Sequence, residues 1–219
     1  MKNIITVVAF GNSITLASRQ SEEKKWIRLL EAKIKTAYPK LAFHFINSGV
    51  GGNTSREGLI RIERDVLTHQ PDYVLVEFGG NDGTSEVERH VSFEEYKLNL
   101  YSIRERIVGE CSADIVLLTF PPIIDEWHCS NKYPFFTKWG GRDKLAEQYR
   151  QITKAFAKKF DIILVDIDKA LREQIMQNNA SEYILPDGVH LTESGNRVIA
   201  ETLFLCLNKN ILTENVITI

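Results

Sequence analysis

Ser13 lies at the end of an apolar run, in the stretch VVAFGNSIT that begins at Val7. A serine hydroxyl becomes an effective nucleophile only when a neighbouring base removes its proton. A serine held between a strand and a helix also lies close to backbone N–H groups, which stabilise the oxyanion of acyl transfer. The alternative interpretation is an ordinary turn or helix-capping serine, so further motifs are needed to distinguish the two.

His190, in the stretch PDGVHLT, could supply the base, because Asp187 precedes it by three residues. A carboxylate that accepts a hydrogen bond from one imidazole nitrogen fixes the tautomer, and the other nitrogen can then accept the serine proton. Pro-Asp-Gly is also a strong turn signal, so a surface turn followed by a structural histidine is the alternative. No aspartate stands at this spacing before three other histidines, which are expected to be structural: His44, His69 and His90.

Two glycine-containing stretches could donate N–H groups to the oxyanion. In the stretch NSGVGGNTS (47–55), which precedes a helix predicted to start at Thr54, Gly49, Gly51 and Gly52 let the backbone approach a ligand closely. The stretch EFGGNDGT (77–84) supplies Asn81, whose side-chain amide is a neutral donor. Plain turns are the alternative for both, and Glu77 is either a buried carboxylate or half of a structural pair. Neither stretch matches a dinucleotide-binding or P-loop motif.

Apolar runs alternate with helical patterns along the chain. Five runs are typical of strands, and most are continuously apolar, as in strands buried on both faces of a parallel sheet: 4–10, 41–47, 73–79, 114–120 and 161–167. Four capping residues predict helix starts: Ser21, Thr54, Ser92 and Thr192. The alternation predicts one α/β domain over residues 1–219, a three-layer α/β/α arrangement with a five-stranded parallel sheet. Ligands of such sheets bind beyond the carboxyl ends of the strands, where all these candidate residues fall.

The composition argues against several classes of protein. The chain has 219 residues, is 43% hydrophobic and carries a formal net charge of -2, which allows a substantial core and predicts no nucleic-acid partner. Its three cysteines lack CxxC spacing, which favours reduced thiols over disulfides or a zinc site. No stretch reaches the roughly 18 apolar residues of a membrane helix, so no membrane insertion is expected. The N-terminal apolar residues are interpreted as a strand and not a signal peptide, which predicts a cytoplasmic location.

Four blocks of the chain, in order, resemble those of the SGNH hydrolases, the GDSL-type esterases and lipases. The blocks are FGNSIT, NSGVGGNTS, GGND and DGVH, and together they span most of the sequence. The resemblance implies a flavodoxin-like fold and a catalytic triad of Ser13, Asp187 and His190. It also implies an oxyanion hole made by the backbone N–H groups of Ser13 and Gly52 and the side chain of Asn81.

One position departs from the family pattern. The family usually has aspartate where this chain has Asn12, a position that supports the nucleophile loop and does not react. Asparagine keeps an acceptor oxygen but loses the charge. We therefore expect the loop to keep its conformation while its electrostatics change.

The resemblance implies a serine esterase that forms an acyl-enzyme and needs no metal or organic cofactor. We expect a small-molecule ester with a small acyl group, with a carbohydrate O-acetyl ester as the specific hypothesis. The alternatives are a lysophospholipase or acyl thioesterase of the same family, and a non-catalytic module that binds a sugar or an anion. The long segment 121–142 either forms an aromatic wall or lid for substrate or only packs against the body. Its candidate residues are Trp127, His128, Tyr133, Phe135, Phe136 and Trp139.

Overall fold

The computed structural model describes residues 4–130 and 132–208. The strands are β1 (Ile5–Gly11), β2 (Phe43–Gly49), β3 (Tyr73–Glu77), β4 (Asp114–Leu118) and β5 (Ile163–Val165). The α-helices are α1 (Ser13–Leu16), α2 (Trp26–Ala37), α3 (Ser55–Asp65), α4 (Phe93–Cys111), α5 (Pro134–Thr137), α6 (Arg142–Lys159), α7 (Ile167–Gln177) and α8 (Glu193–Leu207). Short 3₁₀ helices are η1 (Glu22–Lys24), η2 (Leu67–His69) and η3 (Ala180–Glu182).

The five strands form one parallel sheet in the order β2-β1-β3-β4-β5. This is the flavodoxin-like order, and the predicted three-layer fold with a five-stranded parallel sheet is confirmed. At the carboxyl end of β1, Gly11 pairs with Gly49 of β2 on one side and with Glu77 of β3 on the other. Three neighbouring strands therefore end at the same level, which brings the loops that follow them together.

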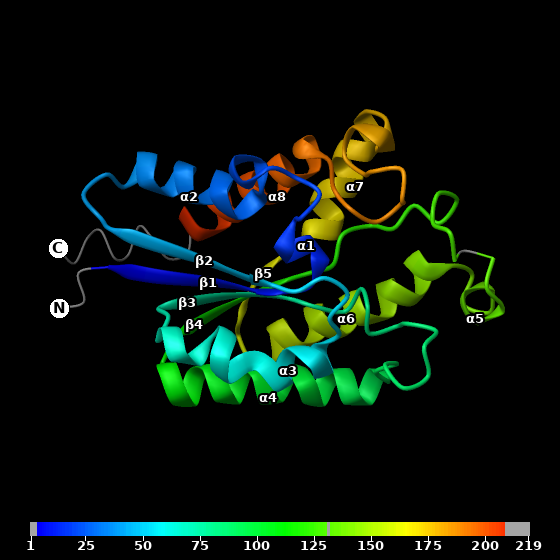
Figure 1. Ribbon diagram of the computed structural model, residues 1–219, viewed down its shortest axis with the longest axis horizontal. Helices are drawn as coiled ribbons and strands as arrows, with labels where there is room; N and C mark the ends of the chain where they lie inside the picture. Colours follow the sequence, from blue (N-terminus) through cyan, green and yellow to red (C-terminus); the bar gives the residue numbers. More distant parts are fainter. Residues whose placement is uncertain (1–3, 131, 209–219) are drawn as a thin grey trace.

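Helices cover both faces of the sheet (Figure 1). α2, α7 and α8 lie on one face, and α3, α4 and α6 lie on the other. Alternate residues of β1 serve the two cores: Val7 and Ala9 pack on the first side, and Val8 and Phe10 on the second. Because strand side chains alternate between faces, a strand covered on both sides has to be apolar at every position. This explains the continuous apolar runs in the sequence.

Three of the four predicted helix starts are confirmed. Thr54, Ser92 and Thr192 each accept a backbone hydrogen bond through the side-chain oxygen at the start of a helix. The prediction at Ser21 is wrong, because a 3₁₀ turn intervenes and α2 begins only at Trp26.

The sequence analysis missed α7 and made the last strand too long. β5 ends at Val165 because the side chain of Asp166 accepts a hydrogen bond from the N–H of Lys169 and so caps α7. Ile167 and Leu171 of this helix are fully buried against the sheet. The predicted strand over 161–167 therefore merged a three-residue strand with the first turn of a helix.

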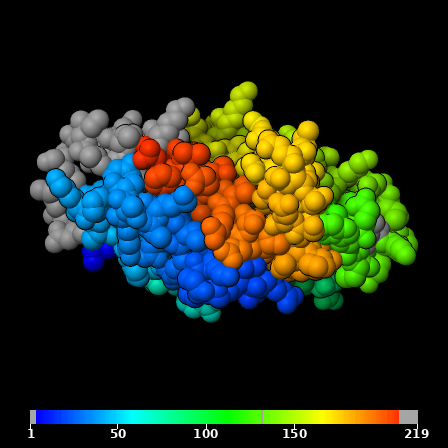
Figure 2. Space-filling model, turned by 90° about the horizontal axis from the view of Figure 1, so that it is seen from above, coloured from blue at the N-terminus to red at the C-terminus, as the bar shows by residue number. Residues whose placement is uncertain are grey.

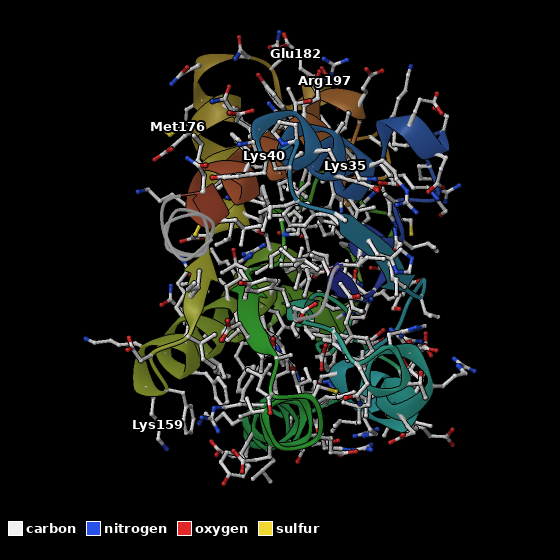
Figure 3. All side chains as sticks on the ribbon, turned by 90° about the vertical axis from the view of Figure 1, so that its left-hand side faces the viewer. Lys35, Lys40, Lys159, Met176, Glu182 and Arg197 are labelled. Atoms are coloured by element: carbon white, nitrogen blue, oxygen red, sulfur yellow. The ribbon has the colours of Figure 1, made fainter. Side chains whose placement is uncertain are left out.

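Charged side chains point outward from both helical layers. Figure 3 shows Arg197 of α8 on the outside of one layer and Lys159 of α6 on the outside of the other. Within the part of the chain that the structure describes, no helix combines the length and the apolar character needed to cross a membrane.

Candidate active site

Ser13 begins α1, directly beyond the carboxyl end of β1. Asn12 caps this four-residue helix, because its side-chain oxygen accepts a hydrogen bond from the N–H of Ile14 at 2.9 Å. Close packing requires glycine at position 11, since a Cβ there would lie 2.5 Å from the carbonyl oxygen of Glu77. The local sequence therefore fixes the Ser13 hydroxyl at the edge of the sheet.

The helix that carries Ser13 is held in place by one buried indole. Trp26 of α2 donates from Nε1 to the carbonyl oxygen of Ile14 at 3.0 Å. The backbone N–H of the same tryptophan donates to the side-chain oxygen of Asn196 in α8 at 3.1 Å. Trp26 thus ties α1 to two helices of the same face.

Ser13, His190 and Asp187 form a continuous hydrogen-bonded chain. Nε2 of His190 lies 3.0 Å from the Ser13 hydroxyl oxygen, and Nδ1 lies 2.8 Å from Oδ2 of Asp187. Oδ1 of the same carboxylate accepts the backbone N–H groups of Val189 at 3.0 Å and of His190 at 2.9 Å. Burial opposes the charge of Asp187, but the hydrogen bonds from His190 and Val189 outweigh it and lower its pKa. An ionised Asp187 holds the ring proton on Nδ1, which leaves Nε2 as an acceptor facing Ser13.

A tight turn presents Asp187 and His190. Gly188 has a φ of 76°, and its N–H donates to the carbonyl of Leu185 at 2.9 Å. The N–H of Ile124, in the loop after β4, donates to the carbonyl of Gly188 at 2.8 Å. Figure 2 shows this orange segment before α8 beside the dark blue segment that follows β1. The Pro-Asp-Gly turn exists, and it carries the two residues next to Ser13.

Gly52 and Asn81 lie on the loops after the two strands that flank β1. Gly52 has a φ of 78°, a conformation that favours glycine, and its carbonyl accepts a hydrogen bond from Arg89 at 2.6 Å. Nδ2 of Asn81 donates to the carbonyl of Asn53 at 3.1 Å. Because an amide nitrogen carries two hydrogens, this bond orients the amide and leaves a second N–H for a substrate.

Asn12 contacts a buried carboxyl group. Its Nδ2 donates to Oε1 of Glu77 at 3.0 Å, while the Thr15 hydroxyl donates to Oε2 at 3.2 Å. Glu77 is only 2% exposed, and this burial raises its pKa to about 8. An aspartate at position 12 would face a second carboxyl group and require a shared proton, whereas an amide supplies the donor and the capping acceptor at once. Asn12 therefore caps α1 and contacts the carboxyl group of Glu77 with the same side chain.

The raised pKa of Glu77 predicts a pH-dependent stability. Its folded pKa of about 8 exceeds the ordinary 4.5. The folded state therefore binds more protons between these values, and its stability falls as pH rises through this window. For Glu77→Gln we expect the free energy of unfolding to fall less steeply with pH, by on the order of 1 kcal/mol per pH unit. Urea unfolding at pH 5 to 8 measures how the free energy of unfolding changes with pH, and Glu94→Gln, at an exposed position, serves as the control. Equal pH dependence in Glu77→Gln and wild type would contradict the raised pKa of Glu77.

Two further buried ionisable side chains hold the loops together, and the sequence analysis missed both. Asp82 accepts the N–H groups of Ser55 and Gly79 at 3.0 Å each, and burial raises its pKa to about 6. Arg61 of α3 donates to the carbonyl of Gly11 at 2.7 Å. The Asn-Asp turn could have indicated Asp82, but no local pattern distinguishes Arg61 from a surface arginine.

Three aromatic residues of the segment 121–142 are engaged in packing. Phe136 is 1% exposed and belongs to the core beneath α4 and α6. It therefore packs against the body of the domain and does not line a substrate site. Phe135 makes an edge contact with His90, with ring centroids 5.6 Å apart. Trp139 makes a similar contact with Phe93 at 5.6 Å.

Other residues of the segment remain candidates for substrate contact. Trp127 and Tyr133 are 37% and 52% exposed, and His128 is half-buried. Trp127 borders a mostly apolar hollow of about 310 Å³ next to the turn of Asp187. The other lining residues are Ser181, Ile184, Leu185, Pro186 and Thr192.

No metal site is formed among the residues that the structure describes, since no three His, Cys, Asp or Glu side chains are grouped for one. Cys111, Cys129 and Cys206 are thiols and form no disulfide. The edge of the sheet holds a serine beside an oriented imidazole and amide donors, which suits acyl transfer.

Comparison with known proteins identifies the family. The model of the GDSL-like lipase/acylhydrolase family matches residues 9–198. The chain belongs to this family. All five residues discussed as nucleophile, base, orienting acid and oxyanion donors fall within the matched range. Membership of the GDSL-like acylhydrolases makes the chain an enzyme, a serine hydrolase that acts on ester bonds.

Several known proteins are similar to this chain over most of their length. YqeF, an uncharacterized lipoprotein of Bacillus subtilis (strain 168), is 30% identical and covers 89% of this chain and 86% of its own. The acetylxylan esterase of Geobacillus stearothermophilus is 24% identical over 87% of this chain and 88% of its own. Thioesterase 1/protease 1/lysophospholipase L1 of Escherichia coli (strain K12) is 25% identical over 90% of this chain and 80% of its own. The crystal structure of the acetylxylan esterase Axe2 from Geobacillus stearothermophilus has a TM-score of 0.76 at 23% identity, over 94% of this chain and 96% of that one, which supports the shared fold.

Proposed function

We propose that this enzyme is a serine esterase in which Ser13 is the nucleophile, His190 is the general base, and the carboxylate of Asp187 orients His190. The observation that carries the proposal is the hydrogen-bonded chain between these residues, with contacts of 3.0 Å and 2.8 Å. Nε2 of His190 takes the hydroxyl proton as Ser13 attacks the ester carbonyl. The same nitrogen then returns the proton to the leaving alcohol, and water releases the acid from the acyl-enzyme.

The tetrahedral oxyanion is held by three N–H donors in this proposal. They are the backbone N–H groups of Ser13 and Gly52 and the side-chain amide of Asn81. The bond from Asn81 to the carbonyl of Asn53 orients the side-chain donor. The bond from Arg89 to the carbonyl of Gly52 restrains the loop that carries the second backbone donor. Donors that are fixed before the reaction need no reorganisation when charge develops.

Asn81→Ala tests the side-chain donor. We expect kcat to fall by about 100- to 1000-fold with little change in KM, because the lost hydrogen bond forms mainly in the transition state. Steady-state kinetics on 4-nitrophenyl acetate measure the effect. Asn178→Ala serves as control, since Asn178 lies exposed after α7. A rise in KM without a fall in kcat would assign Asn81 to ground-state binding instead.

We propose that the substrate is an ester with a small acyl group, and specifically an O-acetylated carbohydrate. The acetylxylan esterase relative supports this class. The exposed face of Trp127 and the small hollow beside the turn of Asp187 also support it, because an aromatic face suits a sugar ring.

Rates on chromogenic esters with two- to twelve-carbon acyl chains, measured beside acetylated xylosides and an acyl-thioester, test this substrate class. We expect the two-carbon ester and the acetylated xyloside to be hydrolysed fastest. A preference for long chains, or for the thioester, would replace this proposal by the lysophospholipase or thioesterase alternative. Failure of a fluorophosphonate probe to label Ser13 in the folded protein would instead support a non-catalytic binding module.

A further inference from the structure

His128 lies in the loop after β4, against the turn that carries Asp187 and His190. The N–H of Ile124 donates to the carbonyl of Gly188, and a Cβ on Gly188 would lie only 3.1 Å from the backbone nitrogen of His128. Asp187 and His190 are both close enough for their charges to affect the pKa of His128. The segment that carries this second imidazole therefore packs against the turn of the residue that we assign as the general base.

Nδ1 of His128 is occupied by one neighbouring residue. The backbone N–H of Ser130 donates to Nδ1 at 3.1 Å, and the Ser130 hydroxyl oxygen lies 3.0 Å from the same nitrogen. A backbone N–H can only donate, so Nδ1 is the acceptor and carries no proton. The proton of the neutral ring is then on Nε2.

Arg142 completes this arrangement behind Ser130. Its guanidinium donates to the Ser130 hydroxyl oxygen at 3.1 Å and lies 4.5 Å from the ring centre of Phe136. Because a guanidinium has no acceptor, the hydroxyl accepts from Arg142 and its own hydrogen is directed to Nδ1 of His128. Ser130 is 6% exposed, so these contacts are shielded from water.

The ring of His128 stays neutral in this environment. Burial lowers its pKa, and the positive charge of Arg142 lowers it further. A neutral ring adds no second positive charge beside His190 when that residue becomes protonated during the reaction. Nε2 has no hydrogen-bond partner among the residues described here, and it is the nitrogen left for a ligand.

We propose that His128 is a specificity residue, whose Nε2–H donates a hydrogen bond to a hydroxyl or ring oxygen of the leaving alcohol. This inference rests on the proposed function, in which His190 returns a proton to that alcohol. The leaving alcohol then lies beside His190, on the turn that the loop of His128 contacts, whereas the oxyanion donors follow β2 and β3. A fixed neutral donor favours an alcohol rich in oxygen acceptors, such as a sugar, over an aromatic or alkyl alcohol.

The test compares two acetyl esters that differ in the leaving group. A methyl xyloside carrying one acetyl group offers hydroxyl and ring oxygens to His128, whereas 4-nitrophenyl acetate offers none at comparable positions. For His128→Phe we expect KM for the xyloside to rise by about 3- to 10-fold, as for the loss of one neutral hydrogen bond. For 4-nitrophenyl acetate we expect KM to rise by a smaller factor than for the xyloside, because its leaving group offers no acceptor at these positions. His128→Gln, which retains a donor near the position of Nε2, should recover most of the KM for the xyloside.

Imidazole ¹⁵N spectra test the tautomer on which the proposal depends, in which Ser130 holds Nδ1 of His128 as an acceptor. We expect the proton of His128 on Nε2 at neutral pH, and a raised pKa of this ring in Ser130→Ala, which loses the hydroxyl donor to Nδ1. A proton found on Nδ1 would overturn the proposal.

The kinetic outcomes separate this proposal from the proposed function. Equal losses of His128→Phe on both esters, or no change on either, would overturn the specificity role while leaving hydrolysis of acetylated sugars intact. A wild-type enzyme that cleaves 4-nitrophenyl acetate but no acetylated xyloside would overturn both the sugar substrate and the role of His128.

Discussion

Ser13→Ala should lower kcat for hydrolysis of 4-nitrophenyl acetate by about 10⁵- to 10⁶-fold, the magnitude found when a serine hydrolase loses its nucleophile. The residual rate reflects only binding and the oxyanion donors, because no acyl-enzyme can form. The hydroxyl lies at a surface edge, where its described hydrogen bond goes to His190. We therefore expect the midpoint of thermal unfolding to change little.

Ser18→Ala is the matched control for this experiment. Ser18 lies exposed just beyond the same short helix, five residues after Ser13. We expect this control to keep wild-type kinetics and to be labelled by a fluorophosphonate, while Ser13→Ala is not labelled. Wild-type activity in a correctly folded Ser13→Ala variant would show that another residue is the nucleophile.

The sheet could be predicted from the sequence largely because its inner strands β1, β3 and β4 are buried on both faces along most of their length. In β1 every residue from Val7 to Phe10 has to be apolar, so the run itself reveals the strand and its environment. β5 has only three residues, and Asp166, which ends it, also starts a helix. Because one apolar run contains both the end of β5 and the start of α7, the sequence alone did not show where the strand ends, and α7 was missed.

The candidate site could be predicted because its residues lie in short linear blocks after neighbouring strands. The supporting residues could not, since their roles depend on contacts between distant segments. Arg61 reaches the carbonyl of Gly11 across 50 positions, and Asp82 accepts from Ser55 across 27. Only the folded loop shows that Ser130 occupies one nitrogen of His128.

Asp187→Asn should lower kcat/KM at pH 7 by about 10⁴-fold, although it removes no atom from the contact with His190. The amide oxygen can replace Oδ1 and still accept the N–H groups of Val189 and His190. The amide nitrogen then takes the place of Oδ2, which lies 2.8 Å from Nδ1. An amide nitrogen can only donate, so Nδ1 becomes an acceptor and the ring proton moves to Nε2.

The imidazole in Asp187→Asn would therefore present a proton to Ser13 where a lone pair is required. We expect ¹⁵N spectra to show this exchange of tautomers together with the loss of rate. Glu182→Gln is the control, because it makes the same change from carboxylate to amide close to Asp187 in the chain. Glu182 is exposed, as Figure 3 shows, and this variant should leave the rate unchanged. A fall in kcat/KM of less than about tenfold, with an unchanged tautomer, would mean that Asp187 does not orient His190. A slow rate together with the changed tautomer would show that the carboxylate acts by fixing the position of one proton.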